Sequence, residues 1–306
     1  MNMKKWVKQN IPELSGRVII VTGGNSGLGY ESLKAFASKG AELIMTARTM
    51  EKGESARESI VRDFPEADIS VMILDLSDLT SVKAFAESFR AKYDRLDVLL
   101  NNAGIMITPY FLTKDGFEGQ MGINHLGHFA LTLRLRDIIK NTSGARVVNV
   151  SSNAHKMGRM DFDNFLFEGG KSYSPMKSYS RSKLANLLFT YELQRRFEAN
   201  AMDAMAIAAH PGTSQTNLDR YIKSKFFYRL LYPLISALSQ DAEMGALPQI
   251  RAAADPDAKG GEYYGPSGLG EIKGYPERTR SSRASYSVED ARKLWELSEK
   301  LTGVKW

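Results

Sequence analysis

No cysteine occurs among the 306 residues, which excludes disulfide bonds, thiolate metal sites and a cysteine nucleophile. Histidine is scarce, and the four present (His125, His128, His155 and His210) show no H-x-x-x-H spacing, so we predict no metal site. The sequence also lacks a run of about 18 apolar residues. Its basic N-terminus has neither the apolar core nor the cleavage site of a signal peptide. We therefore expect a cytoplasmic protein.

Concentrated charge of one sign is missing as well. The chain has 41 Lys and Arg residues against 35 Asp and Glu, a net charge of +6, but its basic residues are scattered. A nucleic-acid-binding surface would need a basic stripe with interleaved aromatic residues, so we expect no nucleic-acid partner. A hydrophobic content of 43% is ordinary for a globular protein. We expect a small-molecule substrate and an anionic cofactor.

Apolar segments rich in β-branched residues alternate with segments of helical periodicity, such as Val82, Phe85, Ala86 and Phe89. Nearly continuous apolar character is typical of parallel strands that are covered on both faces. The alternation predicts an α/β fold with a Rossmann-type, doubly wound parallel sheet in a single domain, 1–306, with an insertion at about 156–177. The predicted strands are Arg17–Thr22, Glu42–Ala47, Ile69–Asp75, Asp97–Asn101, Arg146–Ser151 and Ala204–Ala209.

A glycine-rich turn, TGGNSGLG, follows the first predicted strand and opens a helix. Free N–H groups and the positive end of a helix dipole converge on an anion in this geometry, and glycine lets the ligand approach the backbone. The spacing is G-x-x-x-G-x-G, and an ordinary tight turn is the alternative. The predicted cofactor-binding residues here are Gly23, Asn25, Ser26, Gly27, Leu28 and Gly29.

The second predicted strand ends at Ala47-Arg48-Thr49, without the carboxylate that would accept the ribose 2′-OH of NAD. The guanidinium of Arg48 can instead bind a 2′-phosphate, and Lys52 could assist. Alternatively, Arg48 is a solvated cation beside Glu51. We predict that NADP(H) is preferred and that NAD(H) is possible.

Four motifs occur in the order typical of one enzyme family: Thr22–Gly29, Asn101-Asn-Ala-Gly104, Ser152 and Tyr179-x-x-x-Lys183. In these the chain resembles the short-chain dehydrogenase/reductase family over nearly its whole length. The segments NHLGHF (124–129), SKLAN (182–186) and LWELS (294–298) are similar to its retinol-dehydrogenase-like branch and bacterial relatives.

Tyr179 and Lys183 are four residues apart and share one helix face. A nearby ammonium lowers the pKa of a phenol toward the working range of an acid–base catalyst. The hydroxyl of Ser152, at the end of the fifth predicted strand, can hold a carbonyl oxygen. The resemblance implies that Ser152, rather than Ser151, is catalytic, that Lys183 also binds the nicotinamide ribose, and that Asn124 holds a proton-relaying water. Taken singly, Tyr179 could be a packing residue and Ser152 a helix cap.

The resemblance implies further cofactor contacts at the ends of other strands. Asp75 and Leu76 would contact adenine. Pro211, Gly212 and Thr216 would lie near the carboxamide. An ordinary turn is the alternative for Pro211 and Gly212 and for the segment after the fourth strand. The segment after the fourth strand, Asn102, Ala103 and Gly104, would line the same half of the cofactor as Asp75.

The resemblance places a substrate lid at about 213–238, and its aromatic part, 221–235, favours an apolar carbonyl compound. Core or oligomer packing and membrane contact are the alternatives, and the helix around Ala185–Phe189 could form a homo-oligomer interface. The predicted function is reversible, NADPH-dependent reduction of an apolar ketone or aldehyde to an alcohol. The alternative is a non-catalytic, dinucleotide-sensing regulatory protein of the same fold. Such proteins tend to lose the tyrosine or the lysine, and this chain keeps both.

Overall fold

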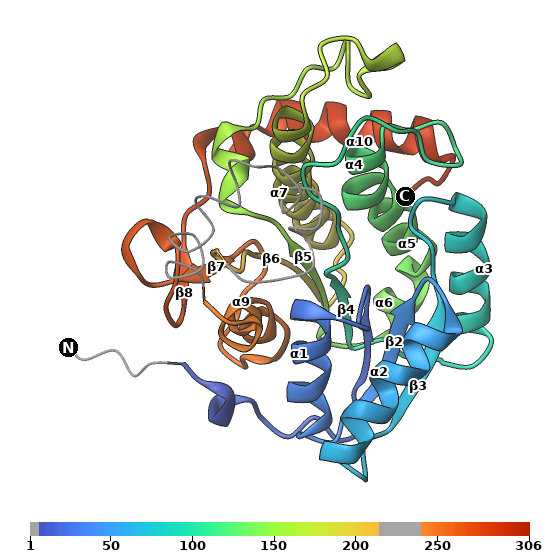
Figure 1. Ribbon diagram of the computed structural model, residues 1–306, viewed down its shortest axis with the longest axis vertical. Helices are drawn as coiled ribbons and strands as arrows, with labels where there is room; N and C mark the ends of the chain where they lie inside the picture. The colour runs from blue at the N-terminus through green and yellow to red at the C-terminus, as the bar shows by residue number, and fades with distance from the viewer. Residues whose placement is uncertain (1–5, 214–239) are drawn as a thin grey trace.

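The computed structural model describes residues 6–213 and 240–306. These residues form one eight-stranded sheet of order β3-β2-β1-β4-β5-β6-β7-β8 (Figure 1). All neighbouring strands are parallel except β7 and β8, which are antiparallel. The predicted Rossmann-type α/β fold is therefore confirmed. The strands are β1 (Val18–Val21), β2 (Glu42–Ala47), β3 (Ile69–Ile73), β4 (Val98–Asn101), β5 (Ala145–Val150), β6 (Ala204–Ala209), β7 (Tyr263–Pro266) and β8 (Pro276–Thr279).

The first six strands lie where the apolar runs predicted them, with ends that differ by at most two residues. Two strands, β7 and β8, were not predicted. Their sequences, YYGP and PERT, are only four residues long. Each contains proline, which lacks a backbone N–H donor, so neither sequence resembles a strand. They form a hairpin at the edge of the sheet, where proline is tolerated.

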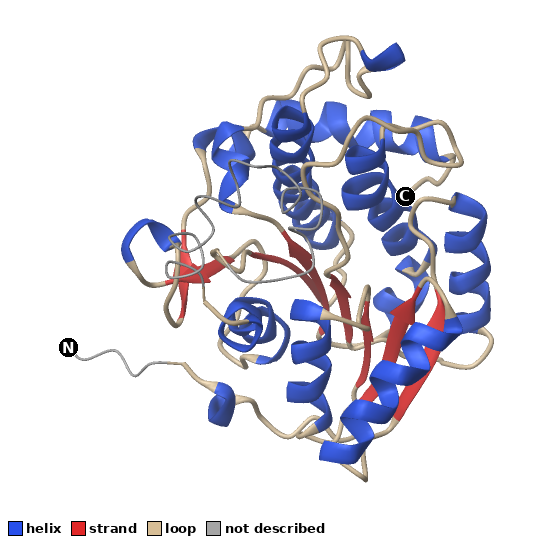
Figure 2. Cartoon of the chain, in the orientation of Figure 1, coloured by secondary structure: helices blue, strands red, loops and turns tan. Residues whose placement is uncertain are grey.

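Helices cover both faces of the sheet (Figure 2). One core contains side chains of α1, α2 and α9 packed on β1, β2 and β4. The other contains α3, α5 and the C-terminal half of α7. The helices are α1 (Gly27–Ala37), α2 (Met50–Asp63), α3 (Leu79–Arg90), α4 (Gly119–Met121), α5 (Gly127–Arg134), α6 (Arg136–Asn141), α7 (Pro175–Ala199), α9 (Ala242–Ala254) and α10 (Val288–Thr302). Across residues 6–213 and 240–306, we find no helix with the length and apolarity needed to span a membrane.

The last helix, α10, packs across α5 and α7. Its Trp295 is fully buried against Phe129 of α5 and Phe189 of α7, with ring centroids 5.1 and 5.8 Å apart respectively. Ser298 of α10 hydrogen-bonds the buried His125 at 2.8 Å. The face of α7 that includes Leu184, Ala185 and Leu188 is covered by α10 in the same way.

The predicted insertion at 156–177 lies over the start of α7 and is held there by a buried cation. The guanidinium of Arg181 donates to the carbonyls of Asn164 (2.7 Å) and Phe165 (3.1 Å) and stacks on Phe167 at 4.2 Å. Several fixed acceptors and an aromatic face suit the planar donor fork of arginine. The predicted lid, including 221–235, and Thr216 fall outside the described residues.

Candidate active site

A cavity of about 970 Å³ opens at the carboxyl ends of the central strands. It lies beside the junction of β1 and β4, where the strand order reverses and where ligands bind in open α/β sheets. Its size is that of a cofactor site. Of the predicted residues, the following line it: Gly23, Asn25, Ser26, Gly27, Leu28, Arg48, Asp75, Leu76, Asn102, Ala103, Gly104, Tyr179, Lys183 and Pro211.

The glycine-rich turn joins β1 to the N-terminus of α1, which faces the cavity. Gly23 has φ +63° and Gly27 φ +57°, values that a residue with a Cβ rarely adopts. Gly29 lies beneath the turn rather than on the cavity wall, and a Cβ there would sit 2.6 Å from the carbonyl oxygen of Gly23. The third glycine is therefore needed for close packing of the helix against the turn.

The loop that follows β4 is fixed to this turn by hydrogen bonds. Asn102 donates from its side chain to the Thr22 carbonyl at 2.7 Å, and its own side-chain oxygen accepts from Gln249 of α9 at 3.1 Å. Gln249 is buried and also bonds Ser32 of α1 at 2.9 Å. Sequence reasoning missed Gln249, because nothing in the pattern of an amphipathic helix distinguishes a glutamine that packs inward.

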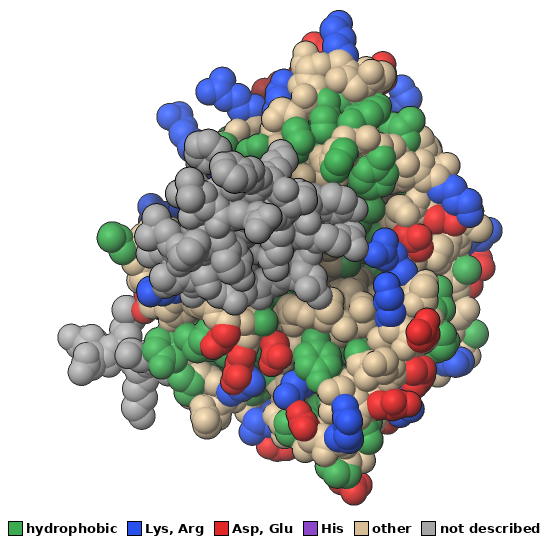
Figure 3. All heavy atoms as spheres, in the orientation of Figure 1, with side chains coloured by type: hydrophobic (Ala, Val, Ile, Leu, Met, Phe, Trp, Pro, Cys, Tyr) green, Lys and Arg blue, Asp and Glu red, His purple; other side chains and the backbone are tan. Residues whose placement is uncertain are grey.

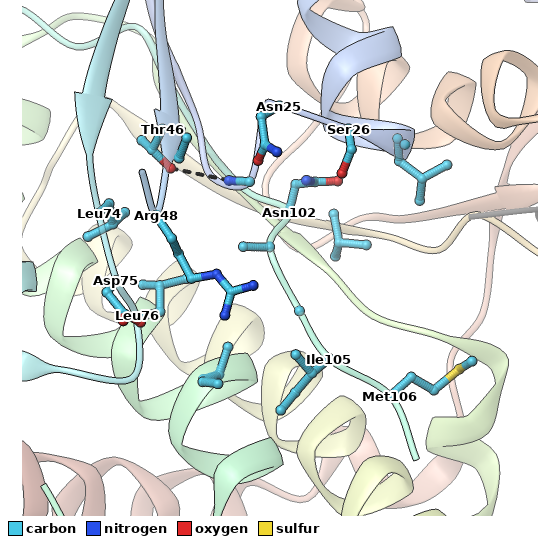
Figure 4. Close-up of a pocket in the computed structure, with 18 of the residues that line it drawn as sticks. Asn25, Ser26, Thr46, Arg48, Leu74, Asp75, Leu76, Asn102, Ile105 and Met106 are labelled. Carbon is cyan, nitrogen blue, oxygen red and sulfur yellow. Dashed lines mark hydrogen bonds between the residues drawn. The ribbon is translucent and has the colours of Figure 1, made fainter. Parts of the chain in front are cut away.

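Arg48 follows β2 and extends its guanidinium into the cavity between Asp75 and Ile105 (Figure 4). Lys52, from the first turn of α2, also lines the cavity. The carboxylate of Asp75 accepts hydrogen bonds from both the backbone N–H (2.9 Å) and the hydroxyl (2.6 Å) of Ser77. Two cations therefore follow β2, and the one carboxylate among the described lining residues, that of Asp75, follows β3.

Tyr179 and Lys183 lie in the first half of α7, which begins with Pro175 at a position where its missing N–H costs nothing. The Lys183 ammonium is 5.8 Å from the centre of the Tyr179 ring and donates to the carbonyl of Val150 at 3.0 Å. Burial lowers the pKa of Lys183 to about 8, since a desolvated ammonium is disfavoured. Lys183 is still protonated at neutral pH, so a cation stands beside the phenol.

Two adjacent serines follow β5, and they have different environments. The hydroxyl of Ser151 is buried and donates to the carbonyl of Lys183 at 2.8 Å. Ser152 is only partly buried and accepts a hydrogen bond from the N–H of Ala154 at 3.2 Å. Ser151 lines the cavity, yet its proton is already engaged by α7. The two hydroxyls therefore differ in their contacts, and the catalytic role of Ser152 stays a prediction.

Asn124 lies in a single turn of π-helix, Gly122–Leu126, between α4 and α5. Its side-chain oxygen accepts from the N–H of Ile105 at 2.9 Å, and its amide donates to Ser182 of α7 at 2.9 Å. A Cβ on Gly104 would lie 3.1 Å from this oxygen and 3.6 Å from the Lys183 nitrogen, so Asn124 and Lys183 flank the same glycine. Such π-turns are frequent at functional sites.

The cavity thus brings together predicted residues of six separate segments. Asn124, Ser152 and Gly212 stand behind or beside its wall rather than on it. Further lining residues were not predicted: Thr46, Thr49, Leu74, Ile105, Met106, Ile123, Val150 and Ser151. Most are apolar strand or loop residues, which have no sequence signal apart from their position after a strand.

The sequence of this chain matches one family along most of its length. A family model described as short chain dehydrogenase matches residues 17–165. Retinol dehydrogenase 12 of Homo sapiens is 39% identical over 294 residues, which cover 96% of this chain and 89% of that protein. Retinol dehydrogenase 14 of Homo sapiens is 38% identical over 307 aligned residues, which cover 95% and 88%. The chain belongs to the retinol-dehydrogenase-like branch of the short-chain dehydrogenase/reductase family.

Solved structures agree with this membership. An uncharacterized protein from Mycobacterium Paratuberculosis has a TM-score of 0.82 and 39% identity, with 99% of both chains covered. A short chain dehydrogenase from Shigella flexneri, complexed with NADP, has a TM-score of 0.63 at 20% identity and covers 82% of this chain, which shows a shared fold. As a short-chain dehydrogenase/reductase, the chain is an oxidoreductase of alcohols or carbonyl compounds and binds a nicotinamide dinucleotide.

Proposed function

We propose that this short-chain dehydrogenase/reductase is an NADPH-dependent carbonyl reductase that converts an apolar ketone or aldehyde to an alcohol, reversibly. The observation that carries the proposal is that Tyr179 and Lys183 line the same cavity as the glycine-rich turn and Arg48. A protein that only sensed dinucleotides could use the ammonium to bind the cofactor ribose, but it would have no use for a phenol paired with that ammonium.

The residues present fit NADPH. The glycine-rich turn, where a Cβ on Gly23 would lie only 3.1 Å from Ala103, would hold the pyrophosphate through backbone N–H groups. Arg48, assisted by Lys52, would bind the 2′-phosphate. Asp75 and Leu76 would contact adenine, and the loops at Asn102–Gly104 and Pro211–Gly212 would contact the nicotinamide nucleoside. Thr216 is proposed for the carboxamide, as the family resemblance implies.

Reduction needs one proton at the carbonyl oxygen, and the bound cofactor supplies the hydride at the carbon. Ser152 would hold the oxygen by donating its hydroxyl proton. Tyr179 would transfer the proton, because the adjacent ammonium of Lys183 stabilises the phenolate that remains. Asn124, held by Ile105 and Ser182, would bind the water that restores the proton through Lys183.

The apolar substrate is supported by the chain's relatives and by its own cavity. Relatives that are 38–39% identical are named retinol dehydrogenases, and retinol is an apolar alcohol. Ile105, Met106 and Ile123 line the described part of the cavity. The direct test is to mix purified protein with NADPH and a panel of ketones, aldehydes and quinones and to follow the loss of NADPH absorbance. No turnover across the panel would contradict the proposal.

Arg48→Asp is expected to reverse cofactor preference. The substitution removes a charge-assisted bond to the 2′-phosphate and adds repulsion, so the ratio of kcat/KM with NADPH to that with NADH should fall by roughly 100-fold. Arg62→Asp, at an exposed position on α2 outside the cavity, makes the same charge change and is the matched control. If the two variants shift the ratio equally, long-range charge rather than a contact determines the preference.

A further inference from the structure

A fully buried histidine, His128 of α5, joins two parts of the site that are far apart in sequence. Its Nε2 is 2.9 Å from the hydroxyl oxygen of Thr22, the first residue of the glycine-rich turn. Its Nδ1 is 3.1 Å from the backbone carbonyl oxygen of Asn124. Thr22 in turn accepts from the N–H groups of Asn102 and Ala103, each at 2.9 Å.

The donor and acceptor chemistry of the partner atoms fixes the position of each proton in this series of hydrogen bonds. A carbonyl oxygen can only accept, so Nδ1 of His128 carries a hydrogen and donates it to Asn124. In a neutral imidazole, Nε2 is then an acceptor and receives the hydroxyl proton of Thr22. The competing acceptor for that proton, the Leu100 carbonyl, is farther away at 3.3 Å. The oxygen lone pairs of Thr22 are thereby left to accept from the loop after β4.

His128 is neutral for two physical reasons. Burial lowers its pKa to about 4, since a charged imidazole would lose its hydration, and the positive charge of nearby Lys183 acts in the same direction. The hydrogen bond to the Asn124 carbonyl opposes this effect but is weaker than the desolvation. The hydrogen-bond directions given above therefore hold across the neutral pH range.

We propose that His128 is a positioning residue with two separable roles, one toward the cofactor and one toward proton transfer. Through Thr22 it orders the two loops that would hold the dinucleotide. Through its hydrogen bond to the Asn124 carbonyl it fixes the backbone of the π-turn from which Asn124 would hold the relay water. The second role rests on the proposed function, whereas the first requires only that the chain bind a dinucleotide.

A packing role would not need this arrangement. An apolar side chain such as leucine would fill the space between α5 and β1, but it would leave the Asn124 carbonyl without this donor and would free the Thr22 hydroxyl to turn toward Leu100. Glutamine, in contrast, offers one donor and one acceptor on a single planar group, as a neutral imidazole does. The pair of substitutions therefore distinguishes hydrogen bonding from packing.

The test is a double-mutant cycle on the full-length protein with two readouts: the Kd of NADPH by fluorescence titration, and kcat at saturating NADPH with a substrate from the carbonyl panel. Thr22→Val should raise Kd roughly tenfold, because it removes the hydroxyl that accepts from the N–H of Ala103 beside the cofactor site. His128→Leu should raise Kd less and should lower kcat roughly tenfold, through the lost donor to Asn124. In the double variant, Kd should equal that of Thr22→Val, because the effect of His128 on cofactor binding acts through Thr22.

His128→Gln should recover most of both losses, and His125→Leu is the matched control. His125 is also fully buried and neutral, but it bonds Ser298 of α10, so its replacement should lower thermal stability without changing Kd. Additive effects on Kd in the double variant, or the same losses in His125→Leu, would overturn the inference. A wild-type protein that binds NADPH but reduces no carbonyl compound would contradict the proposed function and the relay role. In that case the double-mutant cycle of Thr22 and His128, read out as the Kd of NADPH, would still test whether His128 orders the cofactor-binding loops.

Discussion

Replacing Tyr179 with phenylalanine is expected to lower kcat for carbonyl reduction by roughly 10²- to 10⁴-fold, the usual contribution of a positioned acid–base group. The ring and its packing on α7 would remain, so the Kd of NADPH should change by less than about threefold. Steady-state kinetics and fluorescence titration measure the two quantities separately. Measuring the two quantities separately is necessary because a variant that merely unfolded would lose both its activity and its affinity for NADPH.

The same helix supplies a matched control. Tyr191 lies 12 positions later on α7 and is as buried as Tyr179, each with 6% of its surface exposed. Its hydroxyl bonds Ser281 at 2.7 Å, away from the cavity. Tyr191→Phe should cost stability through that lost bond and leave kcat nearly unchanged. Equal kcat in wild type and Tyr179→Phe would remove Tyr179 from the mechanism.

The second large effect is acid lability. Burial lowers the pKa of His125 to about 3 and those of His128 and His155 to about 4, and it lowers the pKa of His210 as well. Unfolded histidines take up protons near pH 6.5, whereas the folded chain cannot. Stability is therefore complete above about pH 6.5 and falls as the pH drops toward 4. At about 1.4 kcal/mol for each pH unit, a histidine lowered from 6.5 to about 4 accounts for roughly 3 kcal/mol.

Three such residues together account for roughly 9 kcal/mol, which is comparable with the whole stability of a typical domain, so the chain should be strongly destabilised as the pH falls toward 4. Glu118, Glu31 and Glu42 act in the opposite direction, because burial raises the pKa of each carboxyl group and so favours the folded state in acid. Urea titrations at a series of pH values measure the slope directly. His125→Gln should reduce the slope of the unfolding free energy against pH by the contribution of one bound proton. Constant stability from pH 7 to pH 5 would contradict the predicted burial of neutral imidazoles.

Much of this architecture could be predicted because its signals are local. A buried parallel strand is a short apolar run, and a phosphate-binding turn needs glycines where φ is positive, as at Gly23 and Gly27. Tyr179 and Lys183 could be paired because helical spacing alone places them on one face. The short strands β7 and β8 could not be predicted, because they form through pairing with neighbouring strands at the edge of the sheet rather than through their own composition.

The residues that position the site by hydrogen bonds could not be predicted from the sequence. Gln249, His128 and Ser151 act through partners that are distant in sequence, and their residue types occur equally often in ordinary helices and turns. The π-turn at Gly122–Leu126 depends on one extra residue per turn, which no hydrophobic period reveals. Sequence patterns identify the residues that would contact a ligand. Only the tertiary contacts identify the residues that position those ligand-contacting side chains.

The burial of Trp295 has a consequence for how copies of this chain meet. The apolar surfaces of α5 and α7, which sequence reasoning proposed for homo-oligomer contact around Ala185–Phe189, are already occupied by the protein's own final helix. A neighbouring subunit would have to displace α10 to reach them, at the cost of exposing an indole. A homo-oligomer of this protein would therefore have to use a different surface from the buried faces of these two helices.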